Sequence, residues 1–356
     1  MIQPFVAIMA GGVGSRFWPA SRETRPKQFL DITGNGKSLL QTTYERFTRL
    51  TNPDRILVVT NKLYRDQVAE QLPAIPSANI LCEPSRNNTA PCVAYTAFRV
   101  AALDADAPIV IAPSDHVIAK EDAFLTAVQI GLDFVSRRDA LVTLGIAPTR
   151  PDTGYGYIQY AREEASAGVF PVHAFREKPD AATAAQYLAE GGYVWNAGIF
   201  IWKAKDILAA FEQHAPQIYS TLAAGGEAYA SDREQAFVDE AYPQTEKISV
   251  DYAIMERADN VYTIPADIGW SDLGTWGSLH AFSNKDAEDN VVQGSNTVVL
   301  DSRNNLIRTN DAKLVVVRGL EDFIIVDEED VLMIYPKSQE QEIKQLTQSL
   351  ADQRFA

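Results

Sequence analysis

The fold is decided near the start of the chain, in the stretch Phe5-Val-Ala-Ile-Met-Ala-Gly-Gly-Val-Gly-Ser-Arg-Phe-Trp-Pro-Ala-Ser-Arg22. The run from Phe5 to Met9 is continuously apolar, which is typical of a buried strand. It breaks into Gly11, Gly12 and Gly14, and glycines let a backbone approach a phosphate chain closely with its N–H groups turned inward. The stretch therefore predicts a strand followed by a phosphate-binding loop.

Positive charge is concentrated directly after this loop. Arg16, Arg22, Arg25 and Lys27 follow the glycines and are opposed only by Glu23. Cations in this position can neutralise the charge of a polyphosphate. A lone Gly-Gly-x-Gly would favour a plain tight turn, but the cations favour the phosphate-handling interpretation. The chain has no Gly-x4-Gly-Lys-Ser/Thr string, and a G-x-G-x-x-G fingerprint would lack its third glycine here.

The bulk composition indicates a globular protein with a sizeable core, since 46% of its 356 residues are hydrophobic and 22% are charged. The formal net charge of −15 argues against nucleic acid or an anionic membrane as the main partner. Cys82 and Cys92 supply no disulfide framework, so we expect buried free thiols. Because the sequence shows no signal-peptide pattern and no long apolar run, we expect a cytoplasmic protein.

Short apolar runs alternate with helix-like stretches, which predicts an α/β domain with a mixed, mainly parallel sheet. We expect strands at 56–60, 80–82, 109–112 and 141–146, antiparallel additions at 155–160 and 169–176, and helices at 63–72, 89–102, 123–136, 181–190, 204–214 and 250–257. Beyond 283–289 the chain turns into short β runs, followed by a helical pattern at 338–354. We therefore expect a catalytic domain, residues 1–285, and a small all-β appendage with a terminal helix, residues 286–356.

The loop resembles the signature of the sugar-phosphate nucleotidylyltransferases, through Ala10-Gly-Gly-Val-Gly-Ser-Arg-Phe-Trp-Pro19 and Pro26-Lys-Gln-Phe29. Its Trp-Pro-x-Ser-Arg and Pro-Lys-Gln-Phe pieces are most similar to the mannose-1-phosphate guanylyltransferases of that family. The resemblance implies a Rossmann-like nucleotide-diphospho-sugar transferase fold (GT-A-like) with a left-handed β-helix-like appendage. It also implies GTP and mannose 1-phosphate as substrates, Mg²⁺ as cofactor and a homodimer, with neither nucleic acid nor a membrane as partner.

Two aspartates are the predicted metal ligands. Asp115 follows the buried strand at 109–112, and ligands collect beyond the carboxyl ends of strands in an open parallel sheet. Asp272 lies in Asp267-Ile-Gly-Trp-Ser-Asp-Leu-Gly-Thr-Trp276, which resembles the family's Gly-Trp-Ser-Asp-x-Gly motif. Mg²⁺ takes one or two carboxylates and leaves its other positions to water and phosphates. The alternatives are a helix cap or turn at Asp115 and a surface turn at Asp272.

Glu83, in Glu83-Pro-Ser-Arg-Asn-Asn-Thr-Ala90, is the predicted reader of the base. Guanine presents N1–H and N2–H₂ donors along one edge, and a carboxylate offers two acceptor oxygens to match them. Asn88 and Thr89 are predicted helpers at a helix start. The alternative is that Asn87 or Asn88 only caps that helix.

The sugar phosphate is assigned to Phe175-Arg-Glu-Lys-Pro179, which resembles the family's Phe-Val-Glu-Lys-Pro motif. Glu177 can accept from two sugar hydroxyls, and Lys178 can bind the phosphate as a point charge. Neighbouring side chains on an extended segment point to opposite sides, so the chain must bend for both to reach one ligand, and Pro179 makes a bend plausible. The alternative is a solvated Glu–Lys pair.

Two further strings complete the resemblance, Asp152-Thr-Gly-Tyr-Gly-Tyr-Ile158 and Tyr193-Val-Trp-Asn-Ala-Gly-Ile-Phe200. Asn196 can donate to a sugar hydroxyl. Gly154 and Gly198 would let the backbone approach the sugar ring.

The implied reaction is in-line attack of the mannose 1-phosphate oxygen on the α-phosphorus of GTP, with pyrophosphate leaving. The nucleophile is already ionised, so catalysis rests on positioning and charge neutralisation. Arg16 would bind the leaving pyrophosphate, and Lys27 would meet charge on the α-phosphate. The remaining nucleotide contacts are assigned to Ala10, Gly11, Gly12, Gly14, Ser15 and Ser114.

Two alternatives stay open. One is a nucleotidylyltransferase for another sugar 1-phosphate or nucleotide, and the other is a non-catalytic regulatory paralogue that binds GDP-mannose. Many bacterial members of the family carry a further mannose-6-phosphate isomerase domain. Since this sequence ends at Ala356, we expect an enzyme without that domain.

Overall fold

The computed structural model describes residues 3–163, 165–350 and 355. Its contacts divide the chain into two compact units, each built from three segments. Unit 1 contains Met1–Gly11, Tyr44–Ser114 and Ile118–Trp270, and unit 2 contains Gly12–Thr43, Asp115–Val117 and Ser271–Ala356. The division therefore falls inside the glycine loop and directly before Asp115. The boundary expected at residue 285 follows composition, whereas these units follow contacts.

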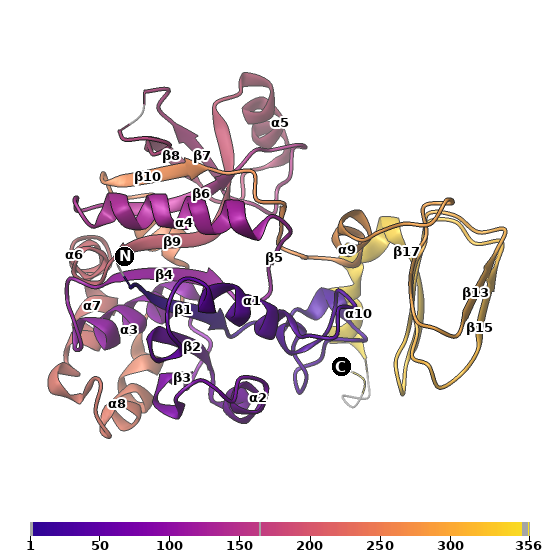
Figure 1. The fold of residues 1–356 in the computed structure, drawn as a ribbon, viewed down its shortest axis with the longest axis horizontal. Coiled ribbons are helices and arrows are strands. Elements are labelled where there is room, and N and C mark those ends of the chain that lie inside the picture. The colour runs from indigo at the N-terminus through magenta and orange to yellow at the C-terminus, as the bar shows by residue number, and fades with distance from the viewer. Residues whose placement is uncertain (1–2, 164, 351–354, 356) are drawn as a thin grey trace. The chain divides into compact units, whose positions relative to one another are not determined.

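Unit 1 is built on a nine-stranded sheet of order β3-β2-β1-β4-β9-β6-β10-β8-β7 (Figure 1). Its strands are β1 (Phe5–Ala10), β2 (Ile56–Asn61), β3 (Ile80–Glu83), β4 (Pro108–Pro113), β6 (Leu141–Ile146), β7 (Tyr157–Tyr160), β8 (Phe170–Arg176), β9 (Tyr193–Lys203) and β10 (Val261–Pro265). β1 pairs in parallel with β2 and β4, whereas β9 runs antiparallel to β4 and β6. The predicted mixed α/β sheet is confirmed. The expectation that it is mainly parallel was wrong, because β7, β8 and β9 pair antiparallel with their neighbours.

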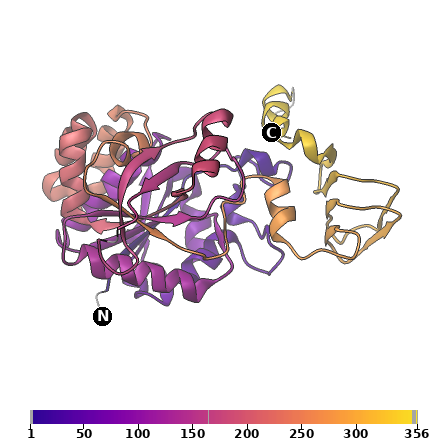
Figure 2. The same cartoon turned by 90° about the horizontal axis from the view of Figure 1, so that it is seen from above.

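Helices cover both faces of this sheet. Unit 1 carries the second half of α1 (Leu39–Thr48), with α2 (Arg65–Gln71), α3 (Thr89–Ala101), α4 (Glu121–Val135), α5 (Ala181–Glu190), α6 (Ala204–His214), α7 (Pro216–Ala223) and α8 (Glu234–Ala241). Helix α4 packs on one face, and α3, α6 and α7 pack together on the other (Figure 2). Phe5 and Ala7 of β1 join the core under α3 and α6, and Val6 and Ile8 are buried toward the opposite face. Burial on both faces explains the unbroken apolar run.

The strand order places the predicted loop at a switch point of the sheet. β2 and β3 follow β1 on one side, and β4 lies on the other, so the crevice beyond β1 and β4 is where an open α/β sheet collects ligands. The Ser114 N–H donates to the Met9 carbonyl at 3.0 Å, which joins the ends of the two strands.

Unit 2 contains a β-helix-like stack of short strands, visible in Figure 1 as successive turns of chain. The strands are β12 (Val291–Gln293), β13 (Thr297–Leu300), β14 (Leu306–Arg308), β15 (Val315–Arg318), β16 (Phe323–Asp327) and β17 (Leu332–Pro336). β12-β14-β16-β17 form one sheet and β13-β15 another, and α9 (Trp276–Phe282) and α10 (Ile343–Ser349) flank them. The predicted β appendage is confirmed.

The arm after the glycine loop belongs to the core of unit 2. Phe17, Trp18 and Leu30 share a buried cluster with Leu306 and Ile324 of the β-helix. The Trp276 indole N–H also donates to the Trp18 carbonyl at 3.1 Å. The segment that carries Lys27 is therefore packed against the C-terminal β strands, which sequence reasoning did not anticipate.

Several elements differ from expectation. The helix predicted at 250–257 is a π-helix, Asp251–Met255, and the terminal helix begins as a 3₁₀ turn, Lys337–Glu342, before α10. The end of that prediction, at 351–354, lies outside the described residues. The prediction did not name the sheet strands β9 and β10 or the helices α1, α7, α8 and α9. It also did not name the two-residue strands β5 (Val117–Ile118) and β11 (Trp270–Ser271). Among the described helices, none has both the length and the apolar character needed to cross a membrane.

Candidate active site

Within unit 2 the glycine loop folds directly onto Lys27. Gly14 has a φ of 70°, and a Cβ built on it would overlap the Cβ of Lys27, so only glycine fits. The Lys27 N–H donates to the Val13 carbonyl at 3.1 Å, and the Gln28 amide donates to the Gly12 carbonyl at 2.9 Å. The loop and the lysine are thus one structural element.

The Lys27 ammonium contacts both segments that carry the predicted metal ligands. It is 3% exposed, and Nζ lies 3.0 Å from Asp115 Oδ2 and 2.9 Å from the main-chain oxygen of Asp272. Burial acts to raise the pKa of the Asp115 carboxyl, but the positive charges of Lys27 and His116 outweigh it, so this pKa lies below its ordinary value. Asp115 is therefore held as an anion.

The donor chemistry of Asp115 and Asp272 fits Mg²⁺. Both supply hard carboxylate oxygens, and Asp272 Oδ1 is fixed by the N–H of Gly274 at 3.1 Å. The described residues form no group of three or more His, Cys, Asp or Glu side chains suited to a metal. Two carboxylates are enough for Mg²⁺ only when phosphates and water complete its shell.

The other cations of the arm lie in different surroundings. Arg16 is exposed, on the 3₁₀ turn Ser15–Phe17 that follows Gly14. Arg22 is an ion-pair partner of Asp330, with Nη1 2.7 Å from Oδ2, and so links the arm to the turn between β16 and β17. Lys27 is the buried cation of this set, whereas Arg16 and Arg25 are exposed to solvent.

In unit 1, Glu83 ends β3 and is buried, with 8% of its surface exposed. Its carboxyl accepts from the Tyr242 hydroxyl and from the Cys92 thiol. Burial raises the pKa of Glu83 to about 7, and these two neutral donors offset that only in part. A Cβ on Gly11 would lie 3.3 Å from Glu83 Oε2, so the predicted base reader adjoins the first glycine of the loop. Ala10, before it, is buried at the end of β1.

The residues after Glu83 mainly organise the start of α3. Asn88, at a φ of 70°, accepts from the Thr89 N–H at 2.8 Å, so it caps the helix as the alternative interpretation held. Thr89 Oγ1 accepts from the Val250 N–H at 2.9 Å. Asn87 is buried and donates to the Tyr242 carbonyl at 3.0 Å. Base contacts by Asn88 and Thr89 stay predictions.

The sugar-side pair shows the expected bend. Lys178 Nζ lies 2.8 Å from Glu177 Oε1, so the two neighbouring side chains share one side of the chain. The bend arises because Lys178 adopts a φ of 48°. Our explanation through Pro179 was wrong, because a following proline favours extended backbone and not this left-handed conformation.

Asn196 is held by its neighbours in β6 and β9. Its Oδ1 accepts from Thr143 Oγ1 and from the N–H of Gly198, both at 3.0 Å. Its amide donates to Asp251 Oδ1 at 2.9 Å. Gly154 lies apart from this group, on an exposed turn where its N–H donates to Asp152 Oδ1 at 2.8 Å.

Comparison with known proteins decides the family. Residues 6–289 match the family described as nucleotidyl transferase, and residues 295–350 match the domain described as MannoseP isomerase/GMP-like beta-helix. The chain belongs to the nucleotidyl transferase family.

Named relatives extend this match over nearly the whole chain. The alginate biosynthesis protein AlgA of Pseudomonas aeruginosa is 39% identical over 349 residues, which cover 96% of this chain and 71% of that protein. Mannose-1-phosphate guanylyltransferase 2 of Escherichia coli O157:H7 is 36% identical over 359 residues, covering 98% and 73%. The crystal structure of mannose-1-phosphate geranyltransferase from Thermus thermophilus has a TM-score of 0.86 at 30% identity, covering 99% of this chain and 100% of that one.

Sequence reasoning missed Asp251 in this nucleotidyl transferase. The residue opens the π-helix, a conformation found frequently at functional sites, and contacts Asn196. Burial and then the nearby Glu177 charge raise the pKa of Asp251 to about 7. Its signal in the sequence was an acidic residue near the start of a predicted helix, directly before the run Tyr252 to Met255, which has no charged residue.

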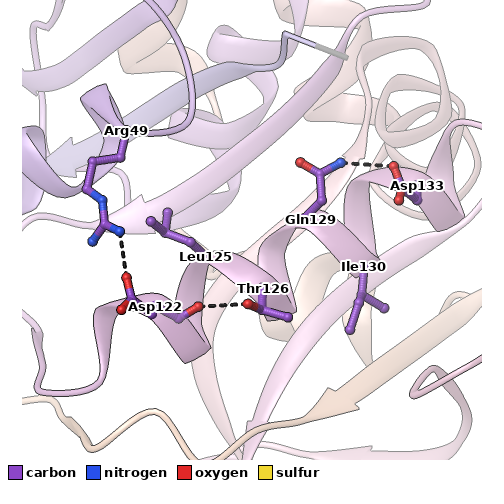
Figure 3. Close-up of a pocket in the computed structure, with 7 residues that line it drawn as sticks. All are labelled: Arg49, Asp122, Leu125, Thr126, Gln129, Ile130 and Asp133. Carbon is purple, nitrogen blue, oxygen red and sulfur yellow. Dashed lines mark hydrogen bonds and ion pairs between the residues drawn. The ribbon is translucent and has the colours of Figure 1, made fainter. Parts of the chain in front are cut away.

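A surface hollow of about 460 Å³ lies along α4 beside Arg49, which follows α1, and none of the predicted site residues lines it (Figure 3). Its lining is Arg49, Asp122, Leu125, Thr126, Gln129, Ile130 and Asp133. Figure 3 shows its polar side chains bound to one another, Arg49 to Asp122 and Gln129 to Asp133. We assign this hollow no part in the chemistry.

Proposed function

We propose that this nucleotidyl transferase converts GTP and mannose 1-phosphate to GDP-mannose and pyrophosphate. The observation that carries nucleotidyl transfer is the buried Lys27 ammonium, bonded to Asp115 and Asp272 and packed on Gly14. The choice of substrates rests on relatives that match nearly the whole of this chain, since one of them is named a mannose-1-phosphate guanylyltransferase.

The chain's own groups supply the catalytic electrostatics. The glycine loop, Gly11 to Gly14, with Ala10, Ser15 and Ser114, offers backbone and hydroxyl groups to the triphosphate. Lys27 would stabilise charge that grows on the α-phosphate, and the exposed Arg16 is free to reach the leaving pyrophosphate. Asp115 and Asp272 would hold Mg²⁺, which supplies further neutralisation of phosphate charge when bound.

Recognition of the two substrates falls to unit 1. Glu83 offers acceptor oxygens to the N1–H and N2–H₂ donors of guanine. Glu177 and Asn196 would bind mannose hydroxyls, with Gly154 and Gly198 beside the ring, and Lys178 would bind the sugar phosphate. Asp251, which contacts Asn196, joins this set.

A pyrophosphate-release screen tests the proposal. Purified protein with Mg²⁺ is given each of four nucleoside triphosphates with each of several sugar 1-phosphates. We expect the highest kcat/KM with GTP and mannose 1-phosphate. A higher value for another pair would make it a different sugar nucleotidylyltransferase. Binding of GDP-mannose without turnover of any pair would indicate the regulatory paralogue.

We further propose that the protein works as a cytoplasmic homodimer. The expected result of light scattering on the purified protein is twice the 39.2 kDa chain mass. Cell fractionation tests the compartment.

A further inference from the structure

Among the described residues, the Glu83 carboxyl is held by neutral donors alone. Tyr242 donates its hydroxyl to Oε1, and Cys92 donates its thiol. In the part of the chain that the structure describes, no Lys or Arg forms an ion pair with Glu83. The two neutral donors therefore compensate a negative charge on Glu83 only in part. N–H groups of a bound ligand could supply further hydrogen bonds to this carboxyl.

Tyr242 is itself fixed in place. Its side chain is fully buried, and its ring packs edge-on against Tyr95 at 6.4 Å. Its carbonyl accepts from the Asn87 amide at 3.0 Å and from Thr245 Oγ1 at 2.8 Å. Since Asn87 lies four residues after Glu83, the same short segment binds both the main chain and the side chain of this tyrosine.

The two carboxyl oxygens of Glu83 then face different surroundings. Oε1 is occupied by Tyr242, whereas Oε2 lies next to the backbone of Gly11, where any larger residue would crowd it. The first glycine of the loop therefore lies beside Oε2, the oxygen to which Tyr242 does not donate. A hydrogen bond to one oxygen fixes the rotation of the carboxylate plane and hence the direction of the other.

We infer that Tyr242, assisted by Cys92, is a positioning residue for nucleotide selection, which turns Glu83 so that Oε2 is presented to a purine with N–H donors on its Watson–Crick edge. The inference rests on the proposed function. In this proposal Tyr242 does not contact the nucleotide, because its hydroxyl donates its hydrogen bond to Glu83.

Tyr242→Phe tests the inference, with Tyr95→Phe as the matched control. Tyr95 is a buried neighbour of Tyr242, and its hydroxyl donates to Glu234 Oε1 at 2.9 Å, away from Glu83. The readouts are kcat/KM for GTP and for ATP, and thermal unfolding. We expect both variants to lose some stability. Only Tyr242→Phe should lower the GTP-to-ATP ratio, by about tenfold, as for loss of one hydrogen bond to a charged group.

A double variant separates positioning from a merely structural role. In a Glu83→Gln background, Tyr242→Phe should cause no further fall in the ratio, because Tyr242 acts through Glu83. An unchanged ratio in Tyr242→Phe overturns the inference, and so does an equal fall in Tyr95→Phe. If Tyr242→Phe does not fold, Cys92→Ala carries the test: a smaller fall is expected, and an unchanged ratio contradicts it.

Failure of the proposed function would look different. If the wild type released no pyrophosphate, the same ratios are measured as equilibrium binding of GTP and ATP by calorimetry. Wild-type protein that does not distinguish GTP from ATP in either assay would overturn the inference together with the role of Glu83. Normal turnover of GTP and mannose 1-phosphate with an unaffected Tyr242→Phe would overturn the inference alone.

Discussion

Glu83 and Asp115 are both carboxyls near the ends of strands, and their surroundings drive them in opposite directions. Glu83 ends β3 and meets a hydroxyl and a thiol, and burial raises its pKa to about 7. Asp115 follows β4, and although burial acts to raise its pKa, Lys27 and His116 hold it below its ordinary value. Whether a partly buried carboxyl stays ionised is thus decided by whether a cation lies against it.

This difference matches two kinds of work. A carboxylate that is permanently charged can serve a cation, which is the role proposed for Asp115. A carboxyl whose pKa lies near 7 is stabilised in its charged form by a ligand that donates N–H hydrogen bonds to it, and recognition of such a ligand is the role proposed for Glu83. The first three predictions below test these two environments, the next tests the base selectivity assigned to Glu83, and the last tests recognition of the sugar phosphate.

Removal of the cation is expected to have the largest effect. Lys27→Ala should lower kcat by roughly a thousandfold, with the KM for GTP changed less than about threefold, because the lost charge acts mainly in the transition state. Steady-state kinetics measures both. Lys203→Ala is a matched control, since Lys203 is also buried and paired with an aspartate, Asp139, at 2.8 Å. Near-normal turnover in Lys27→Ala would refute the role.

Neutralising the carboxylates comes next. Asp115→Asn and Asp272→Asn should each lower activity by about a hundredfold or more at saturating Mg²⁺, and EDTA should silence the wild type. Circular dichroism should show an intact fold. Asp267→Asn, which removes an exposed carboxylate bound to Lys120, should keep nearly full activity. Full activity without a divalent cation would contradict the metal assignment.

The raised pKa of Glu83 also predicts how stability depends on pH. Between its ordinary value of 4.5 and about 7, the folded protein binds more protons than the unfolded chain, so stability falls as pH rises through this window. Glu83→Gln removes the contribution. Its free energy of unfolding relative to the wild type should therefore increase by about 3 kcal/mol from pH 4 to pH 8. Denaturant titrations at both pH values measure it, and a constant difference would mean an ordinary pKa.

Much of the fold could be predicted because periodicity reports local burial. The apolar run of β1 and the alternation through α3 and α4 gave the mixed α/β sheet, and the short runs after residue 290 gave the β stack. What local pattern could not report was which segments pack together. Phe17 and Trp18 directly follow the first strand of the sheet in the sequence, yet they share a buried cluster with α9 and with strands of the β-helix.

The candidate site followed the same rule. Glycines, charged strings and family motifs led to Lys27, Asp115 and Glu177, because these residues stand in recognisable local strings. Asp251 and Tyr242 were missed because each joins the candidate site only through a hydrogen bond to a residue far away in the sequence. The partner is Asn196 for Asp251 and Glu83 for Tyr242. The conformation of Lys178 was missed because sequence rules disfavour a positive φ before proline.

Nucleotide choice should respond to the same glutamate. Glu83→Gln replaces one acceptor oxygen with a donor that opposes N1–H or N2–H₂ of guanine, so the GTP-to-ATP ratio of kcat/KM should fall by roughly 10- to 100-fold. Competition assays with both nucleotides measure the ratio. If the nucleotide profile does not change, base reading belongs to Asn88, Thr89 or the backbone.

The smallest effect is expected on the sugar side, where the charge is most exposed. Lys178 is half-exposed and already paired with Glu177, so water screens part of its interaction with a phosphate. Lys178→Ala should raise the KM for mannose 1-phosphate by about tenfold with little change in the KM for GTP. Lys205→Ala, which removes an exposed lysine paired with Asp106, is the control and should change neither.

Glu177→Gln completes this test. It leaves the phosphate anchor in place but alters hydroxyl recognition, so it should weaken discrimination between mannose 1-phosphate and its epimer glucose 1-phosphate by several-fold, as expected when one hydrogen bond to a charged acceptor is lost. The ratio of kcat/KM for the two sugars measures it. If Lys178→Ala and Glu177→Gln both impaired GTP binding and left the sugar parameters unchanged, this segment would belong to nucleotide recognition, and the poised carboxyls Glu83 and Asp251 would then serve the same substrate.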